Sequence, residues 1–234
     1  NLIIATDSNH LKLFSNEKKL KWDYSETAYT FLVNHKKIIN NCARQFFLKD
    51  GPLAFLPTSN TQTSIVWSVK NKSSTEKIIL NLDDRINFLK MISENFLDLT
   101  SCPKQAEKFG LTFQFLSKIA LSRVIFMGDI THKIHPIAGQ GWNMTLRDIA
   151  ILSDLIKTKL ERGYDIGDFK ILKEYESKTK IGNLLFAVSI DLIKKAFSSQ
   201  SFAISQLRKK SFLIASKPTV MKKIIDFADK GLRF

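Results

Sequence analysis

Glycine is scarce in this sequence, with nine residues among 234, whereas phenylalanine occurs eighteen times. None of the nine glycines falls in the spacing GxGxxG, so the sequence lacks the fingerprint of a dinucleotide-binding strand–turn–helix unit. Any ligand-binding loop built on close backbone approach must therefore use the few glycines that are present.

Cysteine is also scarce, because Cys42 and Cys102 are the only two. They lie far apart and form no CxxC pair, which excludes a disulfide framework and predicts unpaired thiols in a reducing compartment. No apolar run approaches the roughly 20 residues that span a bilayer. The apolar stretch at residues 2–5 is too short for a signal peptide and has no basic residue before it. We therefore expect a soluble or peripheral protein.

The overall composition is that of a globular chain, with 44% hydrophobic and 25% charged residues. Lys and Arg outnumber Asp and Glu by 36 to 22, a formal charge of +14 that favours anionic partners. Such partners include acidic lipid head groups, phosphorylated small molecules and nucleic acid, but nucleic-acid binding rests on charge alone and is not expected. Equally, a lysine-rich genome produces this surplus without any functional meaning.

Hydrophobic periodicity predicts a β-rich first half and a mostly helical second half. The first half is expected to be an antiparallel meander, with residues 12–23 as a charged loop. The predicted strands cover residues 2–5, 24–33, 43–47, 53–56, 64–69, 111–119 and 124–127. Helices are predicted at residues 81–99, with Asp83 or Asp84 as the cap, at 143–160, and from 169 onward.

The stretch that carries chemistry is residues 123–148, RVIFMGDITHKIHPIAGQGWNMTLRD. A buried strand ends in Gly-Asp, a loop with two histidines follows, and a Gly-Gln-Gly turn leads into a helix. Backbone N–H groups at a helix N-terminus favour an anionic or oxygen-rich ligand, and glycines let a flat ring approach. A carboxylate at the carboxyl end of a strand is well placed to hold a sugar or ribityl hydroxyl.

The spacing GD-x-x-H-x-x-x-P-x-x-G-Q-G-x-N-x-x-x-x-D resembles the second FAD-binding motif of the flavoprotein aromatic hydroxylases related to p-hydroxybenzoate hydroxylase. The matching positions are Gly128, Asp129, His132, Pro136, Gly139, Gln140, Gly141, Asn143 and Asp148. A match at nine spaced positions is highly specific, whereas a lone GQG would mean little.

Two further blocks resemble the ubiquinone-biosynthesis (2-polyprenylphenol) hydroxylases within this group. GPLAFLP at residues 51–57 and SIVW at 64–67 are similar to their substrate-domain signature, and LIIATD at 2–7 is similar to their third motif. Ser8 stands where that motif usually has glycine. The family's GxGxxG unit is expected to precede Asn1 or to come from another polypeptide, so this chain alone should bind FAD weakly or not at all.

The resemblance implies the C-terminal part of a p-hydroxybenzoate hydroxylase-like FAD-binding fold of α+β or α/β class. It has an antiparallel β substrate domain and a helical C-terminus. Residues 1–13 would end the FAD-binding domain, and residues 14–110 would form the substrate-binding sheet with one helix. Residues 111–160 would form the FAD-binding strand–loop–helix, and residues 161–234 the C-terminal helical region.

The implied activity is that of an FAD-dependent monooxygenase. NAD(P)H reduces FAD, and the reduced flavin uses O2 to hydroxylate the ring of a polyprenylated phenol in ubiquinone biosynthesis. The resemblance identifies no catalytic side chain. Two alternatives stay open: a related flavin hydroxylase of a soluble phenol, and a non-catalytic accessory or remnant protein that binds lipid or a partner enzyme.

The resemblance also assigns roles in cofactor binding. Gly128 and Asp129 would hold the ribityl or pyrophosphate region, and Pro136 would stack near the flavin ring. Asp7 would orient the FAD ribose region through its turn. Backbone N–H groups of Gly139, Gln140, Gly141, Trp142 and Asn143 would face the pyrimidine edge of the isoalloxazine. For each residue the alternative is a turn, cap or rigid-loop role.

The remaining polar residues of the motif have weaker assignments. His132 either contacts the flavin region or is structural, and Asp148 is expected to serve the first turn of its helix. His135 matches no family position, and two histidines without a third ligand do not predict a metal site.

Two features outside the 123–148 motif, a set of aromatic residues and a basic C-terminal segment, carry further predictions. Phe47, Phe55 and Trp67 either line a pocket for an apolar aromatic substrate or pack in the core. Residues 205–234 hold eight Lys and Arg side chains against two Asp, with apolar residues interleaved. This pattern predicts docking on an anionic membrane surface, or else solvated charge on a packed helix pair. The resemblance in turn implies a cytoplasmic protein at the inner face of the membrane, within an assembly of ubiquinone-biosynthesis enzymes.

Overall fold

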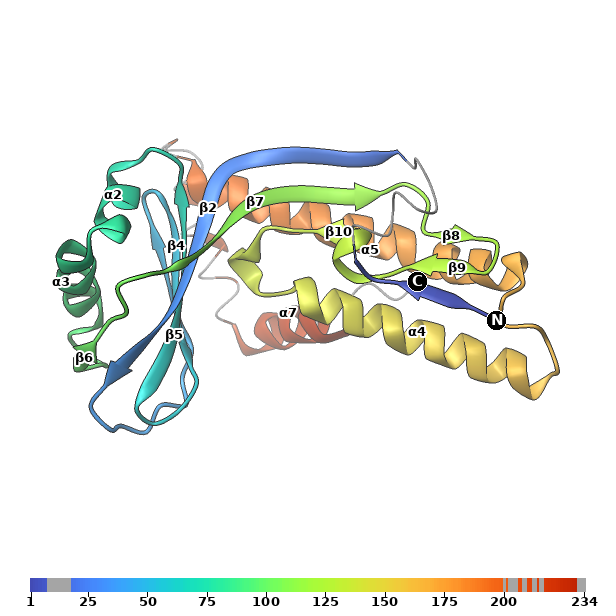
Figure 1. Cartoon of the computed structure of the whole chain (residues 1–234), viewed down its shortest axis with the longest axis horizontal. Coiled ribbons are helices and arrows are strands. Elements are labelled where there is room, and N and C mark those ends of the chain that lie inside the picture. The colour runs from blue at the N-terminus through green and yellow to red at the C-terminus, as the bar shows by residue number, and fades with distance from the viewer. Residues whose placement is uncertain are drawn as a thin grey trace. The chain divides into compact units, whose positions relative to one another are not determined.

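The computed structural model describes residues 1–7, 18–199, 201, 206, 207, 210, 211, 214 and 217–230 (Figure 1). It divides into two compact units. Unit 1 comprises residues Asn1–Trp22 and Thr112–Phe234, and unit 2 comprises Asp23–Leu111. The boundaries fall within strands β2 (Lys19–His35) and β7 (Glu107–Leu116).

Unit 2 is built on an antiparallel sheet in which β2 pairs with β5 (Gln62–Lys70), β5 with β4 (Gly51–Pro57), and β4 with β3 (Arg44–Leu48). The short strand β6 (Leu99–Ser101) also pairs with β2. Two helices, α2 (Ser74–Leu80) and α3 (Leu82–Ser93), cover one face of this sheet (Figure 1). The predicted antiparallel pairing is confirmed, but only β3, β4 and β5 follow one another as a meander, because β2 lies beside β5 and not beside β3.

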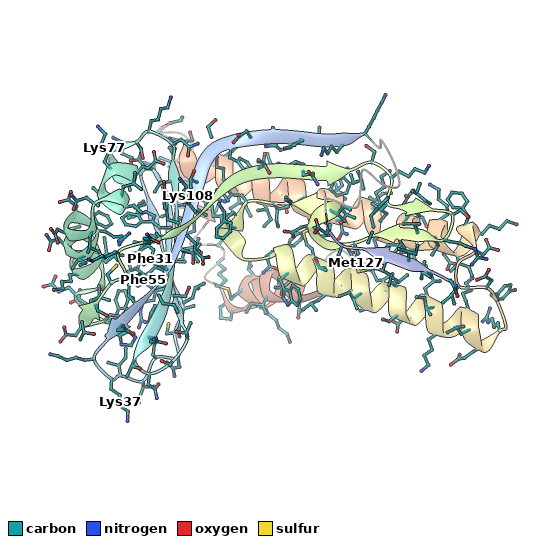
Figure 2. All side chains as sticks on the ribbon, viewed as in Figure 1. Phe31, Lys37, Phe55, Lys77, Lys108 and Met127 are labelled. Atoms are coloured by element: carbon teal, nitrogen blue, oxygen red, sulfur yellow. The ribbon has the colours of Figure 1, made fainter. Side chains whose placement is uncertain are left out.

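The core of unit 2 forms because alternate residues of each strand are apolar and face the two helices. Phe31 and Phe55 point into this core, whereas Lys37 and Lys77 point away from the unit (Figure 2). Trp67 is fully buried and stacks on Phe88 of α3, with ring centroids 4.9 Å apart.

The helical segment of unit 2 differs from its prediction. One helix was expected from residue 81, capped by Asp83 or Asp84, but two helices are present and Asn81 is the cap. The side chain of Asn81 accepts hydrogen bonds from the backbone N–H groups of both aspartates, at 3.0 and 3.1 Å. An Asx side chain that accepts these bonds also turns the chain, and so separates α2 from α3.

Unit 1 contains a small sheet in the order β1-β9-β8, formed by Ile3–Ala5, Val124–Phe126 and Ala120–Leu121. Strands β1 and β9 are parallel, with Ile3 opposite Val124 and Ala5 opposite Phe126. Two long helices, α4 (Gly141–Glu161) and α5 (Phe169–Ser198), pack against each other. The fully buried Ile125, Phe126, Leu172 and Tyr175 belong to the core that these elements share. The strand predictions at residues 2–5 and 124–127 and the helix prediction at 143–160 are confirmed.

Strand β2 begins earlier than predicted, because residues 19–23 are strand and not loop. The indole of Trp22 stacks on Phe113 of β7, with ring centroids 3.8 Å apart and planes 2° from parallel. Aromatic stacking between neighbouring strands extends the pairing beyond the apolar alternation that marks residues 24–33. The rest of the predicted loop, residues 12–17, lies outside the described residues.

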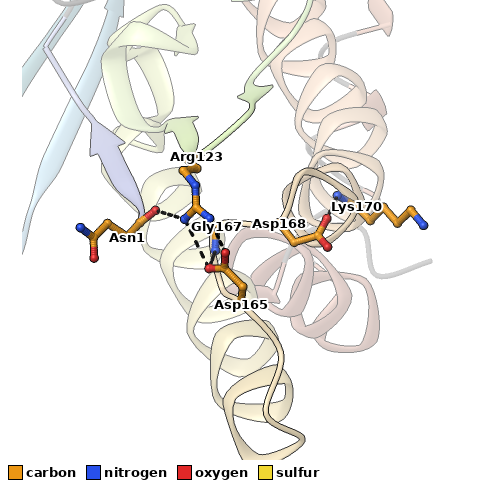
Figure 3. A network of polar contacts seen from close by, with 6 residues as sticks. All are labelled: Asn1, Arg123, Asp165, Gly167, Asp168 and Lys170. Carbon is orange, nitrogen blue, oxygen red and sulfur yellow. Dashed lines mark hydrogen bonds and ion pairs between the residues drawn. The ribbon is translucent and has the colours of Figure 1, made fainter.

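A polar network joins the start of β9 to the loop between α4 and α5 (Figure 3). The guanidinium of Arg123 donates to the carbonyl of Asn1 at 3.0 Å and pairs with the carboxylate of Asp165. Asp165 also accepts from the backbone N–H of Gly167 at 2.9 Å. The hydrogen bond from Arg123 is the main reason that the pKa of Asp165 lies below its usual range. Because both side chains are half-exposed, this network positions the loop more than it stabilises the fold.

The C-terminal part contains α7 (Pro218–Lys230), which agrees with the prediction of helix from residue 169 onward. Among the described residues, none of the helices is both long enough and apolar enough to cross a membrane. Most of the basic segment 205–217 lies outside the described residues.

Candidate functional site

Two carboxylates follow neighbouring parallel strands at the same edge of the small sheet in unit 1. Asp7 comes two residues after β1, and Asp129 comes three residues after β9. The N–H of Met127 donates to the carbonyl of Ala5 at 3.0 Å, so the two strands stay paired to their carboxyl ends. Both aspartates are exposed. This edge is where α/β sheets bind ligands, and the two predicted acidic residues both lie there.

Gly128 makes the turn that presents Asp129. It begins the 3-10 turn η1 (Gly128–Ile130), has a φ of +75° and is buried. Its carbonyl accepts from the backbone N–H and the hydroxyl of Thr131, at 2.9 and 2.8 Å. Gln114 donates to the carbonyl of Ile130 at 3.0 Å. The backbone around Asp129 is therefore fixed, while its carboxylate faces outward.

A second 3-10 turn, η2 (Pro136–Ala138), forms the middle of the loop. Pro136 occupies its first position, where the missing N–H costs nothing. His135 is fully buried, and its Nδ1 accepts from the N–H of Ile137 at 3.1 Å. Gly139 ends the turn in the left-handed region, with a φ of +61°. His135 therefore serves as a cap, and glycine at 139 adopts the left-handed conformation without strain.

The N-terminus of α4 follows at once and carries the positive end of the helix dipole. Gln140 occupies the N-cap position, but among the described residues no side chain, its own included, makes a capping hydrogen bond to this helix. The first turn of the helix also holds no acidic residue. Asn143 donates instead to the side-chain oxygen of Gln140 at 3.0 Å. Trp142 is 69% exposed. Among the described residues no side chain occupies these first-turn N–H groups, so they are available as donors to a ligand.

The space beside the two loop glycines is open. A Cβ added at Gly139 or at Gly141 would meet no atom within 4 Å. A flat, anionic or oxygen-rich ring could therefore lie against this backbone, as the sequence predicted for residues 139–143.

The two remaining polar residues of the motif face the protein interior. His132 lies on β10 (His132–Lys133), and its Nε2 is 3.0 Å from Oδ2 of Asp148. Asp148 accepts a second bond through Oδ1 from Nδ2 of Asn183, at 2.8 Å. The prediction that Asp148 serves the first turn of its helix is wrong, because it is the eighth residue of α4 and is buried. Burial and the nearby Asp148 carboxylate raise the pKa of Tyr175 well above its usual value.

Asn183 was missed by sequence reasoning. It stands on α5, 35 residues beyond Asp148. An asparagine within a helical pattern gives no signal of its partner, so only the packing of α5 against α4 reveals it.

Unit 2 carries a separate cavity of about 390 Å³. Its lining residues are Thr30, Phe31, Leu32, Ser64, Pro103, Gln105 and Glu107. Of the aromatic residues considered at the sequence level, Phe55 and Trp67 pack in the core, and Phe47 is 46% exposed. The alternative of core packing therefore holds for two of the three.

Comparison with known protein families identifies the family of this chain. The FAD binding domain family matches residues 8–180. The chain belongs to the FAD binding domain family. This match spans η1, the glycine loop and α4, and it confirms the resemblance to the flavoprotein hydroxylases.

Similar sequences within the FAD binding domain family include proteins named for ubiquinone biosynthesis. The mitochondrial ubiquinone biosynthesis monooxygenase COQ6 of Dictyostelium discoideum is 30% identical over 220 residues, which cover 80% of this chain and 44% of that protein. The ubiquinone hydroxylase UbiL of Rhodospirillum rubrum is 29% identical over 189 residues, covering 80% of this chain and 43% of that protein. The chain thus spans about half the length of these relatives.

Solved structures share the fold. The p-nitrophenol 4-monooxygenase PnpA from Pseudomonas putida DLL-E4 has a TM-score of 0.71 at 17% identity, covering 100% of this chain and 60% of that one. Klebsiella pneumoniae HpxO complexed with FAD and uric acid has a TM-score of 0.72 at 15% identity, covering 99% and 60%. The predicted fold class, p-hydroxybenzoate hydroxylase-like with an antiparallel sheet and helices, is confirmed.

Proposed function

We propose that this chain forms part of an FAD-dependent monooxygenase that hydroxylates the aromatic ring of a polyprenylated phenol in ubiquinone biosynthesis, with NAD(P)H as reductant. The observation that carries this proposal is the uncapped N-terminus of α4, which follows an open glycine loop beside Asp129. The names of the ubiquinone-biosynthesis relatives support the substrate class. They favour this function over an accessory protein.

The residues present fit FAD. Residues 139–143 offer backbone N–H groups and open space to the pyrimidine edge of the isoalloxazine, and Pro136 borders the same loop. Gly128 and Asp129 would hold the ribityl or pyrophosphate region, and Asp7 the ribose region, both at the carboxyl edge of the sheet. The exposed Trp142 adds an aromatic surface at the helix start.

FAD and the chain would contribute different parts of the proposed activity. FAD, when bound, supplies the electron transfer from NAD(P)H and the reaction with O2. The chain binds and orients the ring, and the positive end of α4 stabilises negative charge at the pyrimidine edge. We assign cofactor binding to residues 1–13 and 111–160, the substrate sheet to 14–110, and the C-terminal helical region to 161–234.

Product analysis and flavin content test this proposal together. The natural gene product, supplied with a polyprenylphenol, NADPH and O2, should form the ring-hydroxylated phenol. Asp129→Ala should lower bound FAD at least about tenfold, the effect of losing one charge-assisted hydrogen bond of about 1.5–3 kcal/mol. Asp84→Ala, at an exposed aspartate of unit 2, is the matched control and should retain its FAD. Full FAD occupancy in Asp129→Ala removes that residue from the site, and absence of hydroxylated product overturns the function.

We propose in addition that α7 contributes to a peripheral contact with the inner face of an anionic membrane, where the polyprenylated substrate and other ubiquinone-biosynthesis enzymes gather. Met221 and Ile225 are exposed apolar residues on this helix, and Lys222 and Lys223 are exposed beside them. An amphipathic helix with lysines beside its apolar residues can lie in the headgroup region of acidic bilayers.

Co-sedimentation with phosphatidylglycerol vesicles tests the membrane contact. Reversing both charges, Lys222→Glu with Lys223→Glu, should weaken binding at least about tenfold, because each lysine near the surface contributes about 1 kcal/mol. The control reverses two exposed lysines of unit 2, Lys37→Glu with Lys77→Glu (Figure 2). Equal losses in the two double variants would show that net charge, and not α7, governs the attraction.

A further inference from the structure

A buried chain of polar side chains crosses unit 1 and joins three elements. His132 on β10 is hydrogen-bonded to Asp148 on α4, and Asp148 is hydrogen-bonded to Asn183 on α5. The side chains of His132 and Asp148 are only 2% and 3% exposed. Buried polar pairs are retained where they fix a unique arrangement, since apolar packing alone is at least as stabilising.

The position of this chain in the loop gives it a specific consequence. His132 comes three residues after Asp129 and four residues before Pro136, between the two 3-10 turns. Asp148 stands on the same helix that begins at Gly141. The hydrogen bond between His132 and Asp148 therefore attaches the middle of the loop to α4, the helix that follows the loop. The Asp129 side of the loop is also held by the pairing of β10 with β7 and by Gln114, so this bond adds a link from both sides of the loop to α4.

The hydrogen-bond roles are set by chemistry. A carboxylate only accepts, so the Nε2–H of His132 and the Nδ2–H of Asn183 are the donors, one to each oxygen of Asp148. Nδ1 of His132 is buried and has no hydrogen-bond partner among the described residues. Among the described residues, the bond to Asp148 is therefore the only hydrogen bond of the His132 ring, and Asn183 holds the other oxygen of Asp148.

We propose that Asp148, acting through His132 and steadied by Asn183, is a positioning residue for the flavin loop. It holds the segment between Asp129 and residues 139–143 against α4, the helix that those residues begin. This inference rests on the FAD site proposed above, but the attachment of the loop to α4 through His132 and Asp148 does not require bound cofactor. It is therefore measurable whether or not FAD binds.

Hydrogen–deuterium exchange of the cofactor-free natural gene product tests the inference. The amides of Thr131, Ile137 and Gly139 donate hydrogen bonds within the loop, so their exchange rates report how readily the loop opens. In Asp148→Asn, which keeps the size of the side chain but removes one acceptor, exchange of these amides should rise at least about tenfold. The FAD dissociation constant should rise by a similar factor.

A matched control breaks a different link between the same two helices. Lys159 on α4 pairs with Glu174 on α5 at 2.9 Å, far along the helices from the loop. Glu174→Gln should leave both loop exchange and FAD affinity unchanged. If Asp148→Asn does not fold, Asn183→Ala takes its place, since it removes only the second donor and should raise loop exchange by about threefold.

The outcomes separate the inference from the proposed function. Unchanged loop exchange in folded Asp148→Asn, or in Asn183→Ala where that variant replaces it, overturns the positioning role. Equal increases in Glu174→Gln also overturn it, because they would indicate general loosening of the helix pair. A wild type that binds no FAD but shows the expected exchange pattern overturns the proposed function and leaves the fastening of the loop in place.

Discussion

Replacing Gly141 by valine is expected to weaken FAD binding about 30-fold or more while leaving the fold intact. A Cβ at this position meets no protein atom within 4 Å, and Gly141 does not adopt a positive φ. The first position of a helix also tolerates a β-branched residue, so little folding free energy is at stake. The cost falls on the ligand, since the branched side chain fills the space that the isoalloxazine would occupy. About 2 kcal/mol of lost contact corresponds to about 30-fold in the dissociation constant.

The matched control for this substitution is Gly110→Val. Gly110 lies on β7, is exposed, and likewise has no atom within 4 Å of an added Cβ. Flavin fluorescence titration of the natural gene product should show full affinity for Gly110→Val and weakened affinity for Gly141→Val, with equal melting temperatures. Undiminished affinity in Gly141→Val would mean that the flavin does not approach this backbone.

Gly51→Ala should lower the free energy of unfolding of unit 2 by about 3 kcal/mol or more. Gly51 starts β4 with a φ of +143°, a conformation that other residues rarely adopt. A Cβ there would lie 2.1 Å from the carbonyl oxygen of Ser68 on β5. This oxygen belongs to the backbone of a central strand, so it cannot move aside without disturbing the β4–β5 pairing. Both the strain and the steric overlap therefore act on the folded state.

Urea denaturation measures this effect when it is followed by the fluorescence of the buried Trp67 in a Trp22→Phe, Trp142→Phe background, where Trp67 is the single tryptophan. Gly110→Ala again provides the control, because neither a steric overlap nor a positive φ applies to that position. Its stability should stay within about 0.5 kcal/mol of the wild type. A Gly51→Ala variant with wild-type stability would contradict the backbone geometry described for the β3–β4 hairpin.

Much of the candidate site follows from local sequence. The apolar strand before Gly128, the two loop glycines and the amphipathic helix after Asn143 are close in the chain. Their pattern alone predicted a strand–loop–helix. The parallel pairing of β1 with β9, which brings Asp7 and Asp129 to one edge, was not visible in the pattern itself. The resemblance assigned both aspartates to the cofactor but did not predict the pairing of the two strands.

The parts that sequence reasoning missed depend on contacts between distant residues. Asp148 was expected near the helix start, whereas its role is set by His132 on a separate strand and by Asn183 on a separate helix. The early start of β2 depends on Trp22 meeting Phe113 across 91 positions. The break between α2 and α3 depends on which of three nearby polar residues, Asn81, Asp83 or Asp84, becomes the cap. In each case the residue types permit the outcome, but tertiary packing selects it.

The most direct test of the central claim is a crystal structure of the natural gene product with bound FAD. The account predicts that the pyrimidine edge of the isoalloxazine lies against the backbone of residues 139–143. It also predicts that the carboxylate of Asp129 contacts the ribityl or pyrophosphate region. A flavin bound elsewhere, with Asp129 and the Gly139–Gly141 turn both facing solvent, would contradict the account.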